Sequence, residues 1–177
     1  MFSIKTYNDS YKVDWNNFVD ISKNSTFLFK REFMDYHAEK FEDFSLLIFY
    51  NSELIALFPC NIRDGEVYSH EGLSYGGVIV KSEIKFLKYL ELFTHLLNYL
   101  DEKSIKTLYI KQIPSIYNSN FNGELDYLSF VTGAKIYRRD IISVIDMQNE
   151  NKISKDRIQG YKRGKKNKLE IKETDDL

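Results

Sequence analysis

Apolar residues recur at spacings of three and four along several stretches of the chain, which is the period of a helix buried on one face. The clearest stretch is Glu83–Leu100. Similar spacing predicts a helix from Trp15 and another over Lys30–Phe41. A shorter helix is predicted over Leu125–Val131, because Gly133 follows it and can take the left-handed conformation that ends a helix.

Short apolar runs bounded by turn residues predict strands. The runs are Ser3–Tyr7, Ser45–Tyr50, Leu54–Pro59, Val67–Ser69, Gly77–Val80, Ile105–Lys111, Ala134–Met147 and Leu169–Ile171. One strand and two helices therefore come first, several strands follow, and helices then alternate with strands. This order predicts an α/β (α+β) fold.

The composition indicates a globular protein. A length of 177 residues is enough for one compact domain, or for half of a larger protein. Hydrophobic residues make up 43% of the chain and charged residues 29%, which is not the mixture of a disordered protein. Apolar runs fall short of the ~20 residues that a membrane span needs, and the N-terminus lacks the pattern of a signal peptide. We therefore expect a cytoplasmic protein.

Cysteine and histidine give no sign of a metal site. Cys60 is the only cysteine, so an internal disulfide and a cysteine-built zinc site are both excluded. The histidines are His37, His70 and His95, and they are too far apart in the sequence to form a metal-binding motif. We expect no metal, and we interpret Cys60, His37 and His95 as structural residues.

Charge is distributed unevenly, although the net charge is only −1. Residues 151–177 contain nine Lys and Arg against five Asp and Glu, and helical spacing predicts a basic helix over Lys152–Lys166. Candidate phosphate-binding residues there are Arg157, Lys162 and Arg163. The alternative is a solvated helix face. Nucleic acid is not an expected partner, because the rest of the chain is acidic.

The segment Ser69–Gly77 is the leading candidate for a functional site. Hydroxyl, imidazole, carboxylate and phenol groups alternate there with glycines, between two apolar strands. Glycines allow a ligand to approach the backbone closely. The candidate substrate-binding residues are Ser69, His70, Glu71, Tyr75 and Gly76. His70 is also the candidate general base, and the catalytic residues are otherwise unknown. The alternative is a tight structural connection in which His70 bonds a buried carbonyl.

Two further places could contribute to substrate binding. Lys111 and Tyr117 flank Pro114 at the end of a predicted strand, and a surface loop is the alternative for both. Arg138 and Arg139 are adjacent on a predicted strand, so their side chains point to opposite faces and at most one can enter a given groove. Arginine suits bidentate contact with a phosphate or carboxylate. The alternative is an exposed pair that balances Asp140.

The order of elements resembles the GCN5-related N-acetyltransferase fold, a mixed and mostly antiparallel sheet flanked by helices. Five local segments carry a narrower resemblance: Thr26–Phe29, Phe33–His37, Ser69–Gly77, Ile113–Tyr117 and Tyr137–Asp140. They are similar to the first, N-terminal domain of FemAB-type acyltransferases, which are tandem proteins, and to related sugar N-acyltransferases of surface-polysaccharide loci.

The resemblance implies that residues 1–150 are an acyltransferase-like domain and that 151–177 lead into a second domain. It implies amide formation on an amino-sugar nucleotide, a lipid-linked precursor or a peptidoglycan-type precursor, with this half shaping the acceptor site. The full-length family uses acyl-CoA (acetyl-CoA) or aminoacyl-tRNA. No cofactor is expected in this half, because Val80–Lys85 lacks the glycines that cradle the coenzyme A pyrophosphate and Glu83 adds negative charge.

Two alternatives remain open. The chain could be a complete small acetyl-CoA-dependent N-acetyltransferase, which predicts measurable acetyl-CoA binding. It could also be a non-catalytic interaction module. In the half-enzyme and the module alike, an apolar surface is expected where a second acyltransferase-like domain, or a second copy of the chain, docks.

Overall fold

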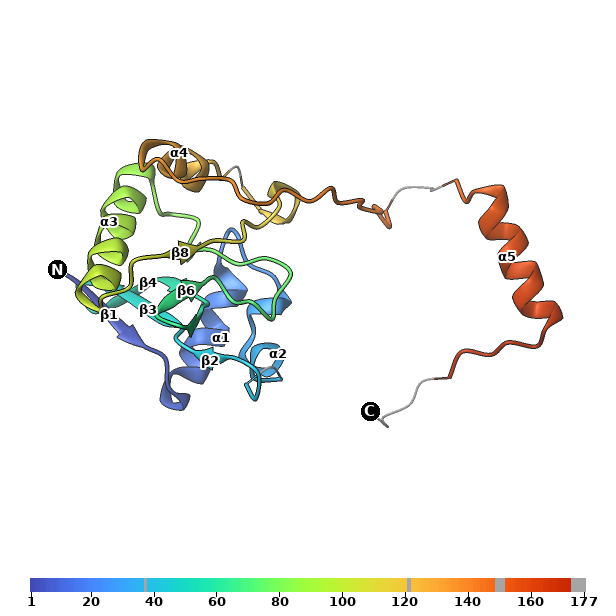
Figure 1. Ribbon diagram of the computed structural model, residues 1–177, viewed down its shortest axis with the longest axis horizontal. Coiled ribbons are helices and arrows are strands. Elements are labelled where there is room, and N and C mark those ends of the chain that lie inside the picture. Colours follow the sequence, from blue (N-terminus) through green and yellow to red (C-terminus); the bar gives the residue numbers. More distant parts are fainter. Residues whose placement is uncertain (37, 121, 149–151, 173–177) are drawn as a thin grey trace. The chain divides into compact units, whose positions relative to one another are not determined.

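The computed structural model describes residues 1–36, 38–120, 122–148 and 152–172 (Figure 1). The chain divides into two units, Met1–Lys135 and Ile136–Leu177. The domain limits expected from the sequence, 1–150 and 151–177, remain a prediction.

Two four-stranded sheets form the first unit. The first sheet has the order β1-β3-β4-β7, and all its neighbours are antiparallel. Its strands are β1 (Phe2–Thr6), β3 (Leu46–Tyr50), β4 (Glu53–Phe58) and β7 (Ile79–Val80). The turn between β3 and β4 places Asn51 and Ser52 at positive φ, which matches the twist of a tight hairpin.

The second sheet has the order β2-β5-β6-β8. Its strands are β2 (Glu42–Asp43), β5 (Asn61–Arg63), β6 (Glu66–Tyr68) and β8 (Leu108–Tyr109). Strand β8 runs parallel to β6, whereas the other neighbours are antiparallel. The chain passes from β4 of the first sheet to β5 of the second through Pro59 and Cys60.

Helices cover both faces of the first sheet. They are α1 (Lys12–Ile21), α2 (Arg31–Asp35), α3 (Phe86–Glu102) and α4 (Glu124–Val131), with single-turn helices η1 (Asp9–Tyr11), η2 (Phe27–Phe29) and η3 (Ser115–Tyr117). In Figure 1 the strands lie between α3 and α1. The second unit contains α5 (Lys155–Lys166).

The alternation of side chains along the strands explains this layering. Ala56 and Phe58 of β4 pack in the cluster that contains α3, whereas Leu57 packs in the cluster that contains α1. Because successive strand residues point to opposite faces, a strand covered on both sides must be apolar throughout. Strand β3 is such a strand, since Leu46–Ile48 are all fully buried. On the α1 side, the indole nitrogen of Trp15 donates to the carbonyl oxygen of Phe29 at 2.8 Å.

The predicted mixed, mostly antiparallel sheet flanked by helices is confirmed. The central helix, the basic helix and the short helix ended by Gly133 are also present, and Gly133 has a φ of +69°. The helix expected over Lys30–Phe41 is shorter, because α2 ends at Asp35. The position of His37 lies outside the described residues.

The long strand predicted over Ala134–Met147 is wrong, as is the strand predicted over Leu169–Ile171. Both stretches lack regular secondary structure and are exposed, and Ile141 has 98% of its surface open to solvent. A run of β-branched residues is a strand only when a neighbour satisfies its backbone groups. Propensity alone therefore mispredicted both stretches.

Candidate functional site

Three backbone segments meet where the two sheets come together. The amide of Ser69 donates to the carbonyl oxygen of Tyr109 at 2.8 Å, and the hydroxyl of Ser69 accepts from the amide of Lys111 at 2.7 Å. The amide of Gly76 then donates to the carbonyl oxygen of Lys111 at 2.6 Å. We call Ser69, Gly76 and Lys111 the strand junction. It holds both ends of the predicted Ser69–Gly77 segment.

Within that segment, His70 and Glu71 are held by the protein itself. His70 is buried at a φ of +62°, with its ring at 5.9 Å from that of Phe41. The carboxylate of Glu71 contacts Arg63 at 2.7 Å and accepts from the side-chain amide of Asn61 at 2.9 Å. These contacts suit the structural alternative for the segment, and substrate binding by His70 and Glu71 stays a prediction.

Lys111, Tyr75 and Tyr117 lie around the same segment. The ammonium group of Lys111 donates to the carbonyl oxygens of Glu71 and Leu73, at 3.0 and 2.5 Å. The hydroxyl of Tyr75 lies 3.3 Å from that of Thr26, and its ring centroid lies 5.3 Å from that of Tyr117. Tyr117 presents 44% of its surface to solvent, so it is available to a ligand.

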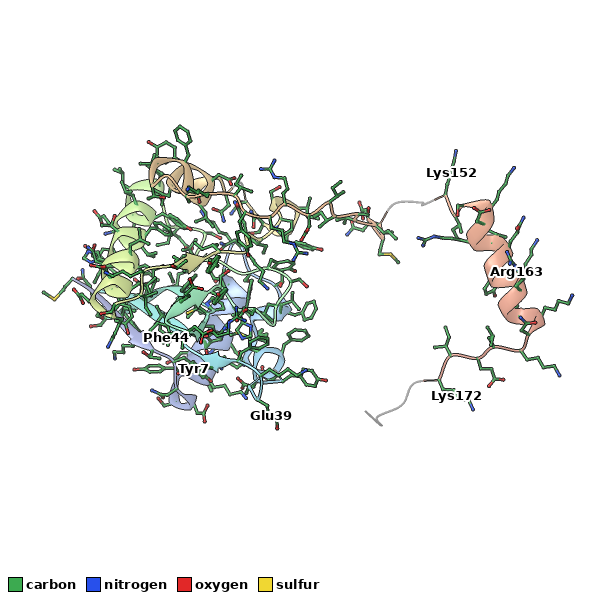
Figure 2. The ribbon with its side chains drawn as sticks, in the orientation of Figure 1. Tyr7, Glu39, Phe44, Lys152, Arg163 and Lys172 are labelled. Atoms are coloured by element: carbon green, nitrogen blue, oxygen red, sulfur yellow. The ribbon has the colours of Figure 1, made fainter. Side chains whose placement is uncertain are left out.

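The basic candidates belong to the second unit. Arg138 bonds Asp140 at 3.0 Å, as in the alternative of an exposed pair, and Arg139 is also exposed. In α5, the hydroxyl of Ser154 caps the helix by accepting from the amide of Arg157. Lys162 and Arg163 are exposed, and Figure 2 shows the Arg163 side chain extending from this helix. The structure thus gathers the candidates from Ser69 to Tyr117 in one unit and those from Arg138 to Arg163 in the other.

A small pocket adjoins the strand junction. Its volume of about 10 Å³ is enough for the centre of one water-sized group. It is lined by Asn24, Gly76, Gly77, Val78, Tyr89, Gln112, Ile113, Asn118, Asn122 and Leu125. The side-chain oxygens of Asn118 and Asn122 are buried, and the described residues offer them no hydrogen-bond donor.

Lys23 contacts residues on both sides of Asn122. Its ammonium group contacts Glu124 at 2.7 Å, and the two side chains are only 5% and 14% exposed. Its carbonyl oxygen accepts from the amide and the hydroxyl of Ser119, at 2.8 and 3.1 Å. We call this set of contacts the Lys23 clasp. It holds Ser119 and Glu124, which lie on either side of Asn122 in the sequence.

Lys23 and Asn24 also occupy the outer edge of β7. The amide of Lys23 donates to the carbonyl oxygen of Val80 at 3.0 Å. The Asn24 side chain donates to the carbonyl oxygen of Val78 at 2.8 Å and accepts from the amide of Val80 at 2.9 Å. The edge of β7 that does not pair with β4 is therefore covered by the chain's own residues.

A larger hollow lies between the first turns of α3 and α4. Its volume is about 600 Å³, it is open to solvent, and it is lined by Phe86, Gly123, Glu124 and Tyr127. The rings of Phe86 and Tyr127 meet edge to face at 5.3 Å. No side chain caps the start of α3, so its first-turn N–H groups are available to a ligand. The Lys81–Lys85 loop before it lacks glycine, as the sequence shows.

Sequence reasoning did not single out Lys23, Asn24, Asn118, Asn122 or Glu124. The one available signal was the recurrence of asparagine at positions 118, 120 and 122, which is equally typical of a polar loop. Over the part of the chain that the structure describes, no three histidine, cysteine or acidic side chains are grouped to hold a metal. Nor is any described helix of a length and apolarity suited to a membrane span.

Cys60 supports the interpretation of a structural cysteine and gives a testable expectation. Burial raises the pKa of its thiol well above the usual range, and the charge of Asp43 adds to this. The thiolate is the reactive form, so we expect Cys60 to resist an aromatic disulfide reagent at pH 8 in the folded protein and to react after unfolding in urea. Rapid labelling of the folded protein would contradict this assignment.

Solved structures that are similar to this chain include several N-acetyltransferases. No family model matches the sequence, and no curated protein matches it. The aminoglycoside N-acetyltransferase AAC(6')-Iy, solved with a bisubstrate analogue, aligns with 82% of this chain and 99% of its own length, at 12% identity and a TM-score of 0.50. The ribosomal-protein-S18-alanine N-acetyltransferase from Escherichia coli aligns with 61% of this chain at 14% identity and a TM-score of 0.43. The chain spans 64% of that enzyme's length. The similarity to AAC(6')-Iy shows that this chain shares the fold of that enzyme.

Proposed function

We propose that this chain is an N-acyltransferase that takes an acyl group from acyl-CoA and forms an amide on a primary amine. The observation that carries the proposal is the hollow between α3 and α4, beside the uncapped start of the 17-residue helix α3. Free N–H groups and the helix dipole favour phosphate groups at such a position. The exposed rings of Phe86 and Tyr127 offer apolar surface to the rest of the donor.

The chemistry of such a transfer is simple. The lone pair of the neutral amine attacks the thioester carbonyl carbon, the carbon–sulfur bond breaks, and coenzyme A leaves as the thiol after taking up one proton. The amine loses that proton as the amide forms. Positioning of the two reactants supplies much of the rate enhancement for a reaction of this kind, so a dedicated side-chain base is not required.

A second candidate function is favoured by the covered edge of β7. Lys23 and Asn24 occupy that edge, and Glu83 places a negative charge before α3. The two residues occupy space at the strand edge, and the Glu83 carboxylate repels phosphate, so both features disfavour a phosphate-bearing donor. In this alternative the chain is the acceptor half of a FemAB-type protein, a second domain holds the donor, and the acceptor is an amino-sugar nucleotide or a lipid-linked precursor of the cell envelope.

Calorimetric titration of the full chain with acetyl-CoA distinguishes the two candidates. We expect one site with micromolar affinity. Replacing Tyr127 with alanine should weaken binding on the order of tenfold, because one aromatic contact is worth roughly 1 kcal/mol or more. Phe130 lies one turn along α4, is exposed and does not line the hollow, so Phe130→Ala is the matched control and should bind normally.

Two results would count against acyl-CoA as the donor. One is no heat of binding at millimolar acetyl-CoA, which would favour the half-enzyme. The other is equal weakening by Tyr127→Ala and Phe130→Ala, which would place the donor outside the hollow.

A further inference from the structure

One side of helix α5 carries both of its apolar residues and all four of its lysines. Successive residues of an α-helix are about 100° apart around the axis, so residues three and four apart share a side. The residues that fall within roughly 140° of this helix surface are Lys155, Ile158, Tyr161, Lys162, Lys165 and Lys166. We call these six residues the lysine face. The rest of the helix contains its only carboxylate, Asp156, both of its glycines and the two arginines, Arg157 and Arg163.

Helix α5 has little to stabilise it within the chain. The structure describes all of Lys155–Lys166, and no residue of this helix is buried. Ile158 and Tyr161 present 41% and 65% of their surfaces to solvent. A helix of 12 residues with two glycines is marginal in water without tertiary packing, and Lys162 and Lys166, four residues apart, repel each other. A negatively charged surface that also accepts apolar side chains would offset both deficits.

A membrane that contains anionic lipids offers such a surface. A lysine can place its ammonium group at the lipid phosphates while its methylene groups lie along apolar surface, and tyrosine is enriched at the membrane–water interface. The lysine face combines the two, since the ammonium group of Lys165 lies 5.0 Å from the centroid of the Tyr161 ring. Clusters of about four to eight basic residues on an amphipathic helix are typical of binding to anionic lipids. Half of the residues of α5 are basic, so this helix suits the surface of a bilayer and not its hydrocarbon core.

We propose that α5 binds the surface of a membrane that contains anionic lipids, with its lysine face toward the headgroups. A membrane is favoured over a nucleic acid, because a phosphodiester backbone pairs with the lysines but offers Ile158 no apolar surface. The proposal goes beyond acyl transfer and does not rest on it, since the helix holds the protein at a membrane whatever the donor and acceptor are.

Sedimentation of the full chain with lipid vesicles tests the proposal. One series of vesicles is equimolar phosphatidylglycerol and phosphatidylcholine, and the other is phosphatidylcholine alone. Each lysine near an anionic surface strengthens binding roughly fivefold, so the four lysines predict half-maximal binding at accessible anionic lipid on the order of 1 mM. We expect no binding to phosphatidylcholine alone, and loss of binding at about 1 M salt, where charges are screened within about 3 Å. The net charge of the whole chain is −1, so its overall charge does not attract it to an anionic vesicle.

Neighbouring exposed residues of α5 supply matched variants. Lys162→Gln removes one charge from the lysine face and should weaken vesicle binding roughly fivefold. Arg163→Gln removes the same charge from the other side of the helix, about 10 Å farther from the headgroups. That distance is about one screening length at 0.1 M salt, so Arg163→Gln should weaken binding about twofold or less. Tyr161→Ala should weaken binding without a change of charge, whereas Gln159→Ala, outside the lysine face, should bind normally.

Equal binding to both kinds of vesicle, or binding to neither, would overturn the proposal. So would equal weakening by Lys162→Gln and Arg163→Gln, or a Tyr161→Ala variant that binds normally, because the lysine face would then have no role as a face. Two competitors identify other occupants at the phosphate concentration of the vesicles. Displacement by an oligodeoxythymidylate would assign a nucleic acid to α5, displacement by inorganic phosphate would assign a soluble phosphate compound, and either result rejects the membrane.

Discussion

Replacing Gly76 with alanine is expected to destabilise the first unit by at least about 3 kcal/mol. The added carbon would lie 2.1 Å from the carbonyl oxygen of Ser69 and 2.9 Å from its hydroxyl. Neither the carbonyl oxygen nor the hydroxyl of Ser69 can move away without breaking hydrogen bonds. The amide of Ser69 is bonded to Tyr109, its hydroxyl is bonded to Lys111, and Gly76 itself is bonded to Lys111. Alanine therefore has to break the strand junction to fit.

Urea unfolding followed by tryptophan fluorescence measures this effect. Trp15 is the only tryptophan and is fully buried, so its emission reports on the core of the first unit. Gly123→Ala is the control, because an added carbon there meets no atom within 4 Å and φ is −106°. We expect that variant to change the free energy of unfolding by no more than about 1 kcal/mol, because the stiffer unfolded chain favours alanine whereas the N-cap position of α4 favours glycine. A Gly76→Ala midpoint equal to that of the unaltered protein would mean that the junction is loosely held.

Replacing Lys23 with methionine is expected to cost about 3–5 kcal/mol. Methionine retains most of the aliphatic side chain but leaves Glu124 buried without its positive partner. Oε2 of Glu124 already lacks a donor among the described residues, and the substitution leaves Oε1 in the same condition. The cost comes from the uncompensated charge and not from the loss of a favourable contact alone.

The double variant Lys23→Met/Glu124→Leu tests that explanation. Because no charge is then buried, its unfolding free energy should return to within about 2 kcal/mol of that of the unaltered protein. Lys106→Met is the matched surface control: its ion pair with Asp101 is 74% and 73% exposed, and its loss should cost less than about 1 kcal/mol. If the double variant is no more stable than Lys23→Met, the methionine has disturbed packing and the ion pair is not the cause.

Much of the fold could be predicted from local patterns, because periodicity and capping act within a few residues. The helix expected over Glu83–Leu100 is observed as α3, and the glycine that ends α4 is observed at positive φ. The failure over Ala134–Met147 has a clear reason. Its β-branched residues favour extended backbone, but hydrogen-bonding partners for a strand come from elsewhere in the chain or from another molecule.

The candidate site was harder to predict, because its geometry depends on contacts far apart in sequence. The sequence indicated the Ser69–Gly77 segment, but nothing in it shows that Arg63 and Asn61 would hold Glu71, or that Ser69 would bond Lys111. Lys23 is an ordinary polar residue at the end of a helix until folding brings Glu124 to it. The burial of the side-chain oxygens of Asn118 and Asn122 also depends on packing that the sequence does not reveal.

The Lys23 clasp also affects the order in which contacts form while the chain is being synthesised. It joins residues separated by 96 and 101 positions in the chain. Long-range contacts repay their loop-closure entropy only late in folding. During synthesis, β7 and α3 are made before Ser119 and Glu124, which complete the clasp. Lys23 and Asn24 precede β7 in the chain, so they can cover its edge before Ser119 and Glu124 have been made, and a covered edge is not open to pairing with another chain.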